Sequence, residues 1–156
     1  MGATAESRGV DKAVASLSRS LSRRERGSTE ARRWLEDREY PPEVAEVAVE
    51  RLISVGALDD ERFAAAFVHD KRELAGWGAE RIRAGLEARG VDSAVIEQAL
   101  AGYGHQAELE RAVTLLENRR RPLEDSTDRD KALGFLVRRG FGLELAYDAV
   151  RSCARG

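Results

Sequence analysis

The side chains that most often perform chemistry are scarce in this sequence. Its histidines are His69 and His105, and its single cysteine is Cys153. None of these lies at metal-ligand spacing from another, and no glycine-rich phosphate-binding motif occurs, so we predict no metal, no cofactor and no enzyme. The carboxylates Asp59, Asp60 and Glu61 precede an apolar periodic stretch. That position is typical of a helix start, where Asp59 or Asp60 caps the helix, rather than of a metal site.

The composition excludes several further classes of protein. Lys and Arg number 26 against 28 Asp and Glu, which excludes a strongly basic protein that holds nucleic acid by bulk charge. A single cysteine favours a reducing compartment, and no apolar run approaches the roughly 20 residues that cross a bilayer. We therefore expect a cytoplasmic protein with no membrane and no small-molecule substrate as partners. The 3 prolines and 6% aromatic residues favour helix over strand.

An internal repeat is the strongest pattern in the sequence. Residues 29–52, 80–103 and 130–153 align without gaps at offsets of 51 and 50. The matched columns include Leu35, Leu86 and Leu136; Arg38, Arg89 and Arg139; and Ala48, Ala99 and Ala149. A column that also holds Leu52 and Tyr103 places Cys153 on an apolar stripe, so we expect a buried thiol rather than a nucleophile. Both histidines are expected on helix surfaces.

Each aligned segment has the pattern of two helices. Gly90 and Gly140 follow the first helix in their repeats, where glycine readily adopts the left-handed conformation that ends a helix. In the first repeat Glu39 stands at this position, so we expect Pro41 to stop the helix and Pro42 to begin the next. A further helix precedes each pair, and in the second repeat we place Phe63, Phe67 and Leu74 on its buried side.

The resulting fold class is all-α, an elongated array of three tandem three-helix repeats, which we call modules. We expect a disordered N-terminus over residues 1–11, and modules over residues 12–57, 58–104 and 105–156. A three-helix unit of this size buries little surface alone, so neighbouring modules must stack.

The central part of the sequence resembles the RecX regulatory family, which modulates the RecA recombinase. The resemblance rests on Leu58–Val68 (LDDERFAAAFV) and Gly76–Val91 (GWGAERIRAGLEARGV), and extends more weakly through Arg24–Leu35 and Lys131–Phe141. It implies a helical, non-enzymatic protein that binds the RecA nucleoprotein filament along its groove. It also implies inhibition of the recombinase, ATPase and coprotease activities.

Two other functions compete with this interpretation. One is a helical-repeat module that binds single-stranded DNA directly, with arginines on phosphate; the other is a helical scaffold for an unrelated partner. Residues 56–104 carry 6 basic and 9 acidic residues, against 9 and 8 in residues 12–55 and 10 and 9 in residues 105–156. This distribution suits a protein partner better than a phosphate backbone, so single-stranded DNA is expected to bind weakly.

The candidate partner-binding residues are cations on the second helix of each module. If equivalent helices line up, they form a discontinuous basic ridge: Arg32, Arg33, Arg81, Arg83, Arg89, Lys131, Arg138 and Arg139. Each could instead be a solvated arginine paired with glutamate. Arg38, Arg89 and Arg139 could equally cap helix C-termini.

Loops supply the remaining candidates. Trp77, between two glycines, is either a contact anchor or a staple that holds its turn to the core, whereas Trp34 is expected to pack. Arg119, Arg120 and Arg121 form the densest basic run. They could reach phosphate or simply be solvated.

Overall fold

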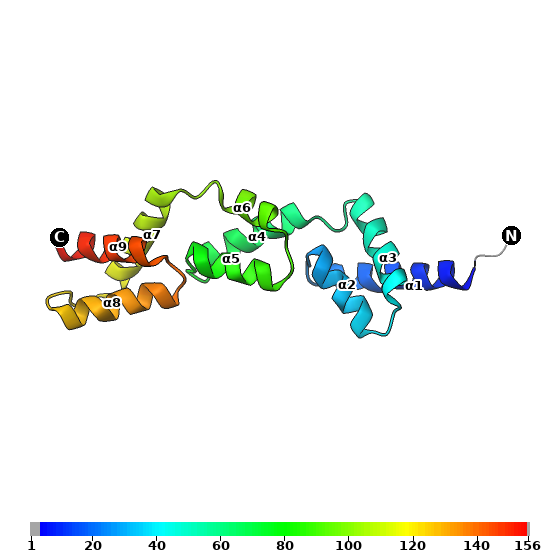
Figure 1. Cartoon of the computed structure of the whole chain (residues 1–156), viewed down its shortest axis with the longest axis horizontal. Coiled ribbons are helices and arrows are strands. Elements are labelled where there is room, and N and C mark those ends of the chain that lie inside the picture. Colours follow the sequence, from blue (N-terminus) through cyan, green and yellow to red (C-terminus); the bar gives the residue numbers. More distant parts are fainter. Residues whose placement is uncertain (1–3, 156) are drawn as a thin grey trace. The chain divides into compact units, whose positions relative to one another are not determined.

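The computed structural model describes residues 4–155, and every regular element among them is an α-helix (Figure 1). The helices follow one another in threes, as the repeat predicts. They are α1 (Ala5–Leu21), α2 (Ser28–Asp37), α3 (Pro42–Ser54), α4 (Asp60–Glu73), α5 (Ala79–Ala88), α6 (Ser93–Leu100), α7 (His105–Arg119), α8 (Ser126–Arg138) and α9 (Leu143–Arg155). The all-helical fold class is therefore confirmed.

Contacts divide the chain into two compact units. The first holds the described residues up to Ala64 together with Glu87–Val95, and the second holds Ala65–Leu86 together with the described residues from Ile96 onward. The first unit thus contains α1, α2 and α3, and the second contains α7, α8 and α9. The predicted module limits at residues 57/58 and 104/105 stay predictions.

Helices α1, α2 and α3 enclose the core of the first unit. Both α1 and α2 pack against α3, because each helix presents one apolar stripe at helical spacing. Leu17 from α1, Leu35 from α2 and Val49 from α3 are fully buried there. In the second unit α7 and α8 pack against α9 in the same manner, around Ala112, Leu136 and Ala149.

The three leucines that the repeat alignment places at equivalent positions are all buried, which supports the alignment. Leu35, Leu86 and Leu136 are each 0% exposed, so all three equivalent leucines are core residues. Phe63 and Phe67 are also buried as expected. Leu74 is not: it is 83% exposed, because α4 ends at Glu73 and Leu74 lies beyond the last turn of the apolar stripe.

The N-terminal segment differs from its predicted disorder. Helix α1 begins at Ala5, and the Thr4 hydroxyl accepts a hydrogen bond from the Ser7 N–H at 3.1 Å, which caps the helix. Val10, on the same helix, is buried in the first core. Residues 5–11 are therefore helical because a side-chain cap and a buried apolar residue stabilise the first turns. Residues 1–3 lie outside the described part of the chain.

Helix α2 ends earlier than predicted. Helix α2 stops at Asp37, before Pro41 can act, and Pro42 begins α3 as predicted. Glu39 adopts φ 68°, the same left-handed conformation that Gly90 and Gly140 adopt at φ 75° and 98°. The turn is thus the same in all three modules, although only two of them use glycine.

A carboxylate from outside the first module caps helix α2. The preceding residue Gly27 has no side chain to cap the helix. Asp60, in the first turn of α4, caps it instead. Its two carboxylate oxygens accept hydrogen bonds from the Ser28 N–H and the Ser28 hydroxyl, both at 2.7 Å. Asp59 caps its own helix α4 by accepting from the Arg62 N–H at 3.0 Å. The two neighbouring carboxylates therefore serve different helices.

A glycine turn completes the same junction. The Thr29 hydroxyl donates to the Gly90 carbonyl at 3.1 Å. A Cβ at Gly90 would collide with the Thr29 side chain, so only glycine allows this approach. The first module and the α5–α6 turn are thereby joined within the first unit.

The second unit contains an equivalent junction. The Glu108 carboxylate, from the first turn of α7, accepts from the Ala79 N–H at the start of α5 at 3.3 Å. The carbonyls of Arg139 and Gly140 accept from the N–H groups of Gly78 and Glu80 at 2.7 and 2.9 Å. A helix N-terminus is again capped by a carboxylate and abutted by a glycine turn.

Buried charge distinguishes this second junction. Glu108 is 6% exposed and forms ion pairs with Arg72, which is 7% exposed, and with Arg111 at 2.7 Å. Arg111 also donates to the carbonyls of Arg72 and Trp77. One carboxylate thus neutralises part of the charge of two guanidinium groups and fixes the loop that follows α4.

Replacing Glu108 should therefore destabilise the fold strongly. We expect Glu108→Ala to lower the free energy of unfolding by about 3–5 kcal/mol, because two largely buried arginines lose their counter-ion. Glu110→Ala on the exposed side of the same helix is the matched control and should change stability by less than about 0.5 kcal/mol. Urea unfolding followed by circular dichroism measures both. Equal effects of the two substitutions would contradict the buried network.

Gly140 provides a second test of the junction. Gly140→Ala should lower the free energy of unfolding by at least about 1–3 kcal/mol, because its φ is positive and a Cβ there meets the backbone and Cβ of Arg81. Gly102→Ala is the control, since nothing lies within 4 Å of its added Cβ. Thermal unfolding should show a clear loss for the first variant alone.

Candidate interaction surface

An aromatic ring flanked by cations lies on α2 in the first unit. The guanidinium carbon of Arg38 is 3.6 Å from the centroid of the Trp34 ring, and that of Arg26 is 5.5 Å away. Arg26 is held in place because its Nη1 donates to the Ser20 hydroxyl at 2.5 Å. Trp34 packs partly against the first core, as predicted. The guanidinium groups of Arg26 and Arg38 lie over its ring in cation–π contact.

Phe135 on α8 has the same surroundings in the second unit. Its sequence position matches that of Trp34, and the guanidinium groups of Arg119 and Arg139 lie 4.6 and 5.0 Å from its ring centroid. The arrangement of one ring and two arginines therefore recurs where the repeat places it.

In the central repeat a loop tryptophan supplies the ring. The aligned position is Gly85, and a Cβ added there would lie 3.6 Å from the Trp77 ring. Trp77 packs edge-on against Phe67, with Lys71 and Arg81 at 4.7 and 4.0 Å from its ring centroid. Trp77 thus lies over Gly85, where an added Cβ would come closest to the Phe67 ring, at 3.0 Å. It staples the loop to the core and remains half-exposed, so its role as a partner contact stays a prediction.

The predicted arginines of α2 and α5 differ in how firmly they are held. Arg83 is bound to Glu97 at 2.7 Å and to Glu80 at 3.0 Å, and these bonds raise the pKa of Arg83 and lower that of Glu97. Arg32 pairs with Glu46 at 2.6 Å. Arg81, by contrast, is exposed over the Trp77 ring. Arg81 is therefore the most accessible predicted contact on α5.

The other predicted arginines of the first two modules contact the backbone or a carboxylate nearby. Arg33 donates to the Ala88 carbonyl at the end of α5 at 3.4 Å, and Arg89 lies 3.7 Å from Glu30. Arg139 donates to the Ala75 carbonyl at 3.4 Å. These arginines support the two junctions, whatever else they contact.

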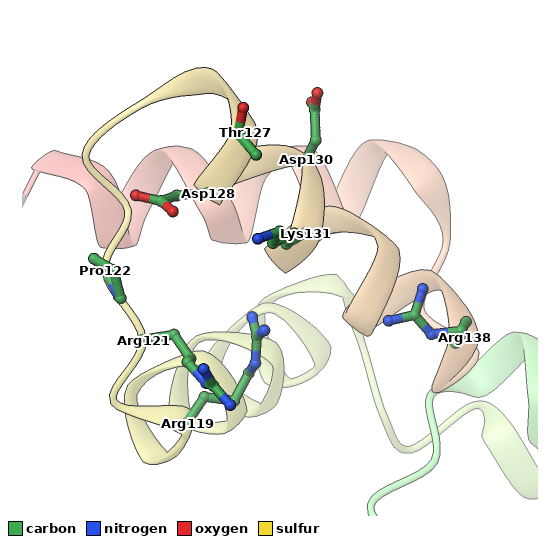
Figure 2. A pocket seen from close by; sticks show the side chains of 8 residues that line it. All are labelled: Arg119, Arg121, Pro122, Thr127, Asp128, Asp130, Lys131 and Arg138. Carbon is green, nitrogen blue, oxygen red and sulfur yellow. The ribbon is translucent and has the colours of Figure 1, made fainter.

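The structure brings four of the predicted cations of the third module together in one cleft (Figure 2). The cleft lies between the end of α7, the following loop and α8. Arg119 and Arg121 come from one side, and Lys131 and Arg138 from the other. Burial lowers the pKa of Arg119, and the charges of Arg121 and Arg138 lower it further. Arg120 is exposed but does not line the cleft; it ends α7 in a left-handed conformation, φ 52°.

The two carboxylates of the same cleft, those of Asp128 and Asp130, do not pair with its cations in the described structure. Asp128 and Asp125 form a capping box at the start of α8, with the Asp128 N–H 2.8 Å from the Asp125 carboxylate. Asp130 points away from the basic side chains in Figure 2. The third-module cleft therefore presents mainly cations.

A second basic cleft, which the sequence did not predict, lies in the first module. It lies between the end of α1, the loop 22–27 and α2, and is lined by five arginines: Arg19, Arg23, Arg24, Arg26 and Arg38. The run Arg23-Arg24-Glu25-Arg26 was a visible signal. The near-neutral charge of the module concealed it, because the neutralising carboxylates lie elsewhere.

The histidines and the cysteine line neither of the two basic clefts. His69 and His105 are exposed, as expected. Cys153 packs on its apolar stripe but is half-buried rather than buried as predicted. Among residues 4–155 no group of three metal-ligating side chains occurs. None of the described helices combines the length and apolar character that a bilayer crossing requires.

Comparison with known proteins identifies the family. The models of the first and second three-helix domains of RecX match residues 11–52 and 59–100. The regulatory protein RecX of Mycolicibacterium vanbaalenii is 39% identical over 141 residues, which cover 85% of this chain and 77% of that protein. This chain belongs to the RecX regulatory protein family.

Other RecX proteins support the assignment. That of Mycobacterium avium is 35% identical over 151 residues, covering 94% of this chain and 87% of its own. The crystal structure of RecX from Lactobacillus salivarius has the same fold, with a TM-score of 0.85 at 20% identity over 96% of this chain and 99% of that one. The helical-repeat prediction thus has independent support in an experimental structure.

The thiol of this RecX protein should react slowly. Burial raises the pKa of Cys153, with a smaller contribution from Glu117, so less thiolate is present at a given pH. At pH 8 we expect iodoacetamide to modify the folded chain at least several-fold more slowly than the same chain in guanidinium chloride. Mass spectrometry over time measures both rates. Equal rates would show an accessible thiolate instead.

Proposed function

We propose that this protein binds the RecA nucleoprotein filament along its groove and inhibits its recombinase, ATPase and coprotease activities without catalysing a reaction. Membership of the RecX family carries the proposal. The repeated modules supply a physical means. A chain of similar modules can contact several identical subunits, and weak contacts that are linked add up through their effective concentration.

The contacts that we propose are the exposed cations and Trp77. Arg81 carries the largest share in the central module, because it is exposed beside Trp77 and has no carboxylate bonded to it in the described structure. Arg83 contributes less, since Glu80 and Glu97 already bind it and a partner would have to replace them. Binding across protomers opposes their relative motion, which slows ATP turnover.

An ATPase titration tests the proposal directly. RecA assembled on single-stranded DNA is mixed with increasing protein, and ATP hydrolysis should fall to a low plateau. Arg81→Glu should raise the half-inhibitory concentration about 10-fold, which corresponds to about 1.4 kcal/mol. Arg8→Glu, an exposed position on α1 outside the proposed contacts, is the matched control and should leave it within about 2-fold.

The outcomes separate the site from the function. Unchanged hydrolysis at saturating wild-type protein would reject the regulatory function itself. Inhibition that Arg81→Glu and Arg8→Glu weaken equally would reject the proposed contact while keeping the function.

A further inference from the structure

The first-module cleft gathers arginines without matching carboxylates. Its lining consists of Arg19, Arg23, Arg24, Arg26 and Arg38 together with Ser16, Ser20 and Trp34. Every charged or hydroxyl side chain in that set can donate hydrogen bonds, and none is an acidic group. The nearest ion pair is that of Arg24 with Glu30, at 3.5 Å, and the Arg24 side chain remains 60% exposed.

The arginines of the cluster repel one another, although one of them is held firmly in place. Burial lowers the pKa of Arg26, and the neighbouring charges of Arg24 and Arg38 lower it further, against a single raising contribution from Glu30. Arg26 is nevertheless fixed, by Ser20 and by the Trp34 ring. Guanidinium groups held in place before binding lose little entropy when a ligand arrives.

We infer that this cleft binds phosphoryl groups. Forked guanidinium donors match the oxygens of a phosphate, and the density of positive charge suits an anion with several charged oxygens better than a single carboxylate. The cleft is partly open to solvent and has a volume of about 380 Å³, near the lower end of the roughly 300–1,000 Å³ range of small-ligand pockets. The groups could come from a nucleic-acid strand or from free nucleotides, and the experiment below separates these sources.

Recurrence of the arrangement supports the assignment. The third-module cleft occupies the same place, where the first helix of a module ends and the second begins, and again gathers several cations (Figure 2). One of them, Arg119, also lies 4.6 Å from the centroid of the Phe135 ring. The sequence differs between the two loops, so the shared feature is the convergent positive charge. We assign the same ligand chemistry to both clefts, with the first as the stronger site because its lining holds no carboxylate.

Binding is measured without any recombinase, so the result does not depend on the proposed regulatory function. A fluorescent 20-nucleotide oligothymidylate reports binding by anisotropy, and pyrophosphate, ATP and polyglutamate compete for it. We expect saturable binding that polyglutamate displaces at least 10-fold less effectively than pyrophosphate does, per charge. The oligonucleotide binding much more tightly than ATP would assign the site to a nucleic-acid strand, and comparable affinities would assign it to free nucleotides.

Variants locate the site. Arg23→Gln with Arg24→Gln should weaken binding at least 10-fold and reduce the dependence of log K on log salt by about 1.4, as expected for two lost phosphate contacts. Arg8→Gln with Lys12→Gln removes the same charge from exposed positions on α1 and is the control. In a Trp77→Phe background, Trp34 is the sole tryptophan, and its emission should change on titration with pyrophosphate.

Three results would overturn the assignment. These are no saturable binding, equal losses in the two double variants, or polyglutamate competing as well as pyrophosphate. Circular dichroism establishes that each variant is folded, and the substituted arginines are exposed, so stability is not expected to change.

Discussion

The fold depends on helix N-termini whose caps come from outside their own module. The first N–H groups of a helix have no partner within it, and a buried one is costly if it stays unpaired. Gly27 and Gly78 precede α2 and α5 and have no side chain to cap them, so Asp60 and Glu108 do so. Helix α8 carries its own capping box. The Asp60 cap therefore links the start of α2 to the start of α4 within the first unit, and the Glu108 cap links the start of α5 to α7 within the second.

The glycine pattern reports these junctions as well as the helix ends. Periodicity explains Gly90 and Gly140 as stop signals, yet Glu39 forms the same turn with φ 68°. The left-handed conformation alone therefore does not require glycine here. What requires it is close approach: a Cβ at Gly90 or Gly140 collides with Thr29 or Arg81, whereas Glu39 is exposed.

Sequence reasoning succeeded where burial follows from local spacing. An apolar stripe is a property of one helix, so the helix positions and the buried column of Leu35, Leu86 and Leu136 could be predicted. The residues that meet at the junctions could not be predicted. Thr29 and Gly90, for example, are 61 residues apart, and neither segment carries a local pattern that indicates the contact. Gly85 interrupts a column that is otherwise aromatic, and this was a visible sign that another ring lies there; the rings are those of Phe67 and Trp77. The first-module cleft was concealed because net charge averages over groups that the fold separates.

The arginines of this chain divide according to what already neutralises them. Arg72, Arg83 and Arg111 are bound by carboxylates or carbonyls within the fold, and a partner gains little from them because the existing bonds must first be broken. In the two clefts only Arg24 has an ion pair in the described structure, with Glu30, and neighbouring cations help to lower the pKa of Arg26 and of Arg119. An anion that entered either cleft would relieve this repulsion as well as form new contacts. Arginines with no carboxylate bonded to them are therefore better candidates for partner contacts than exposure alone would select. By that criterion the clefts and Arg81 stand above the remaining ridge.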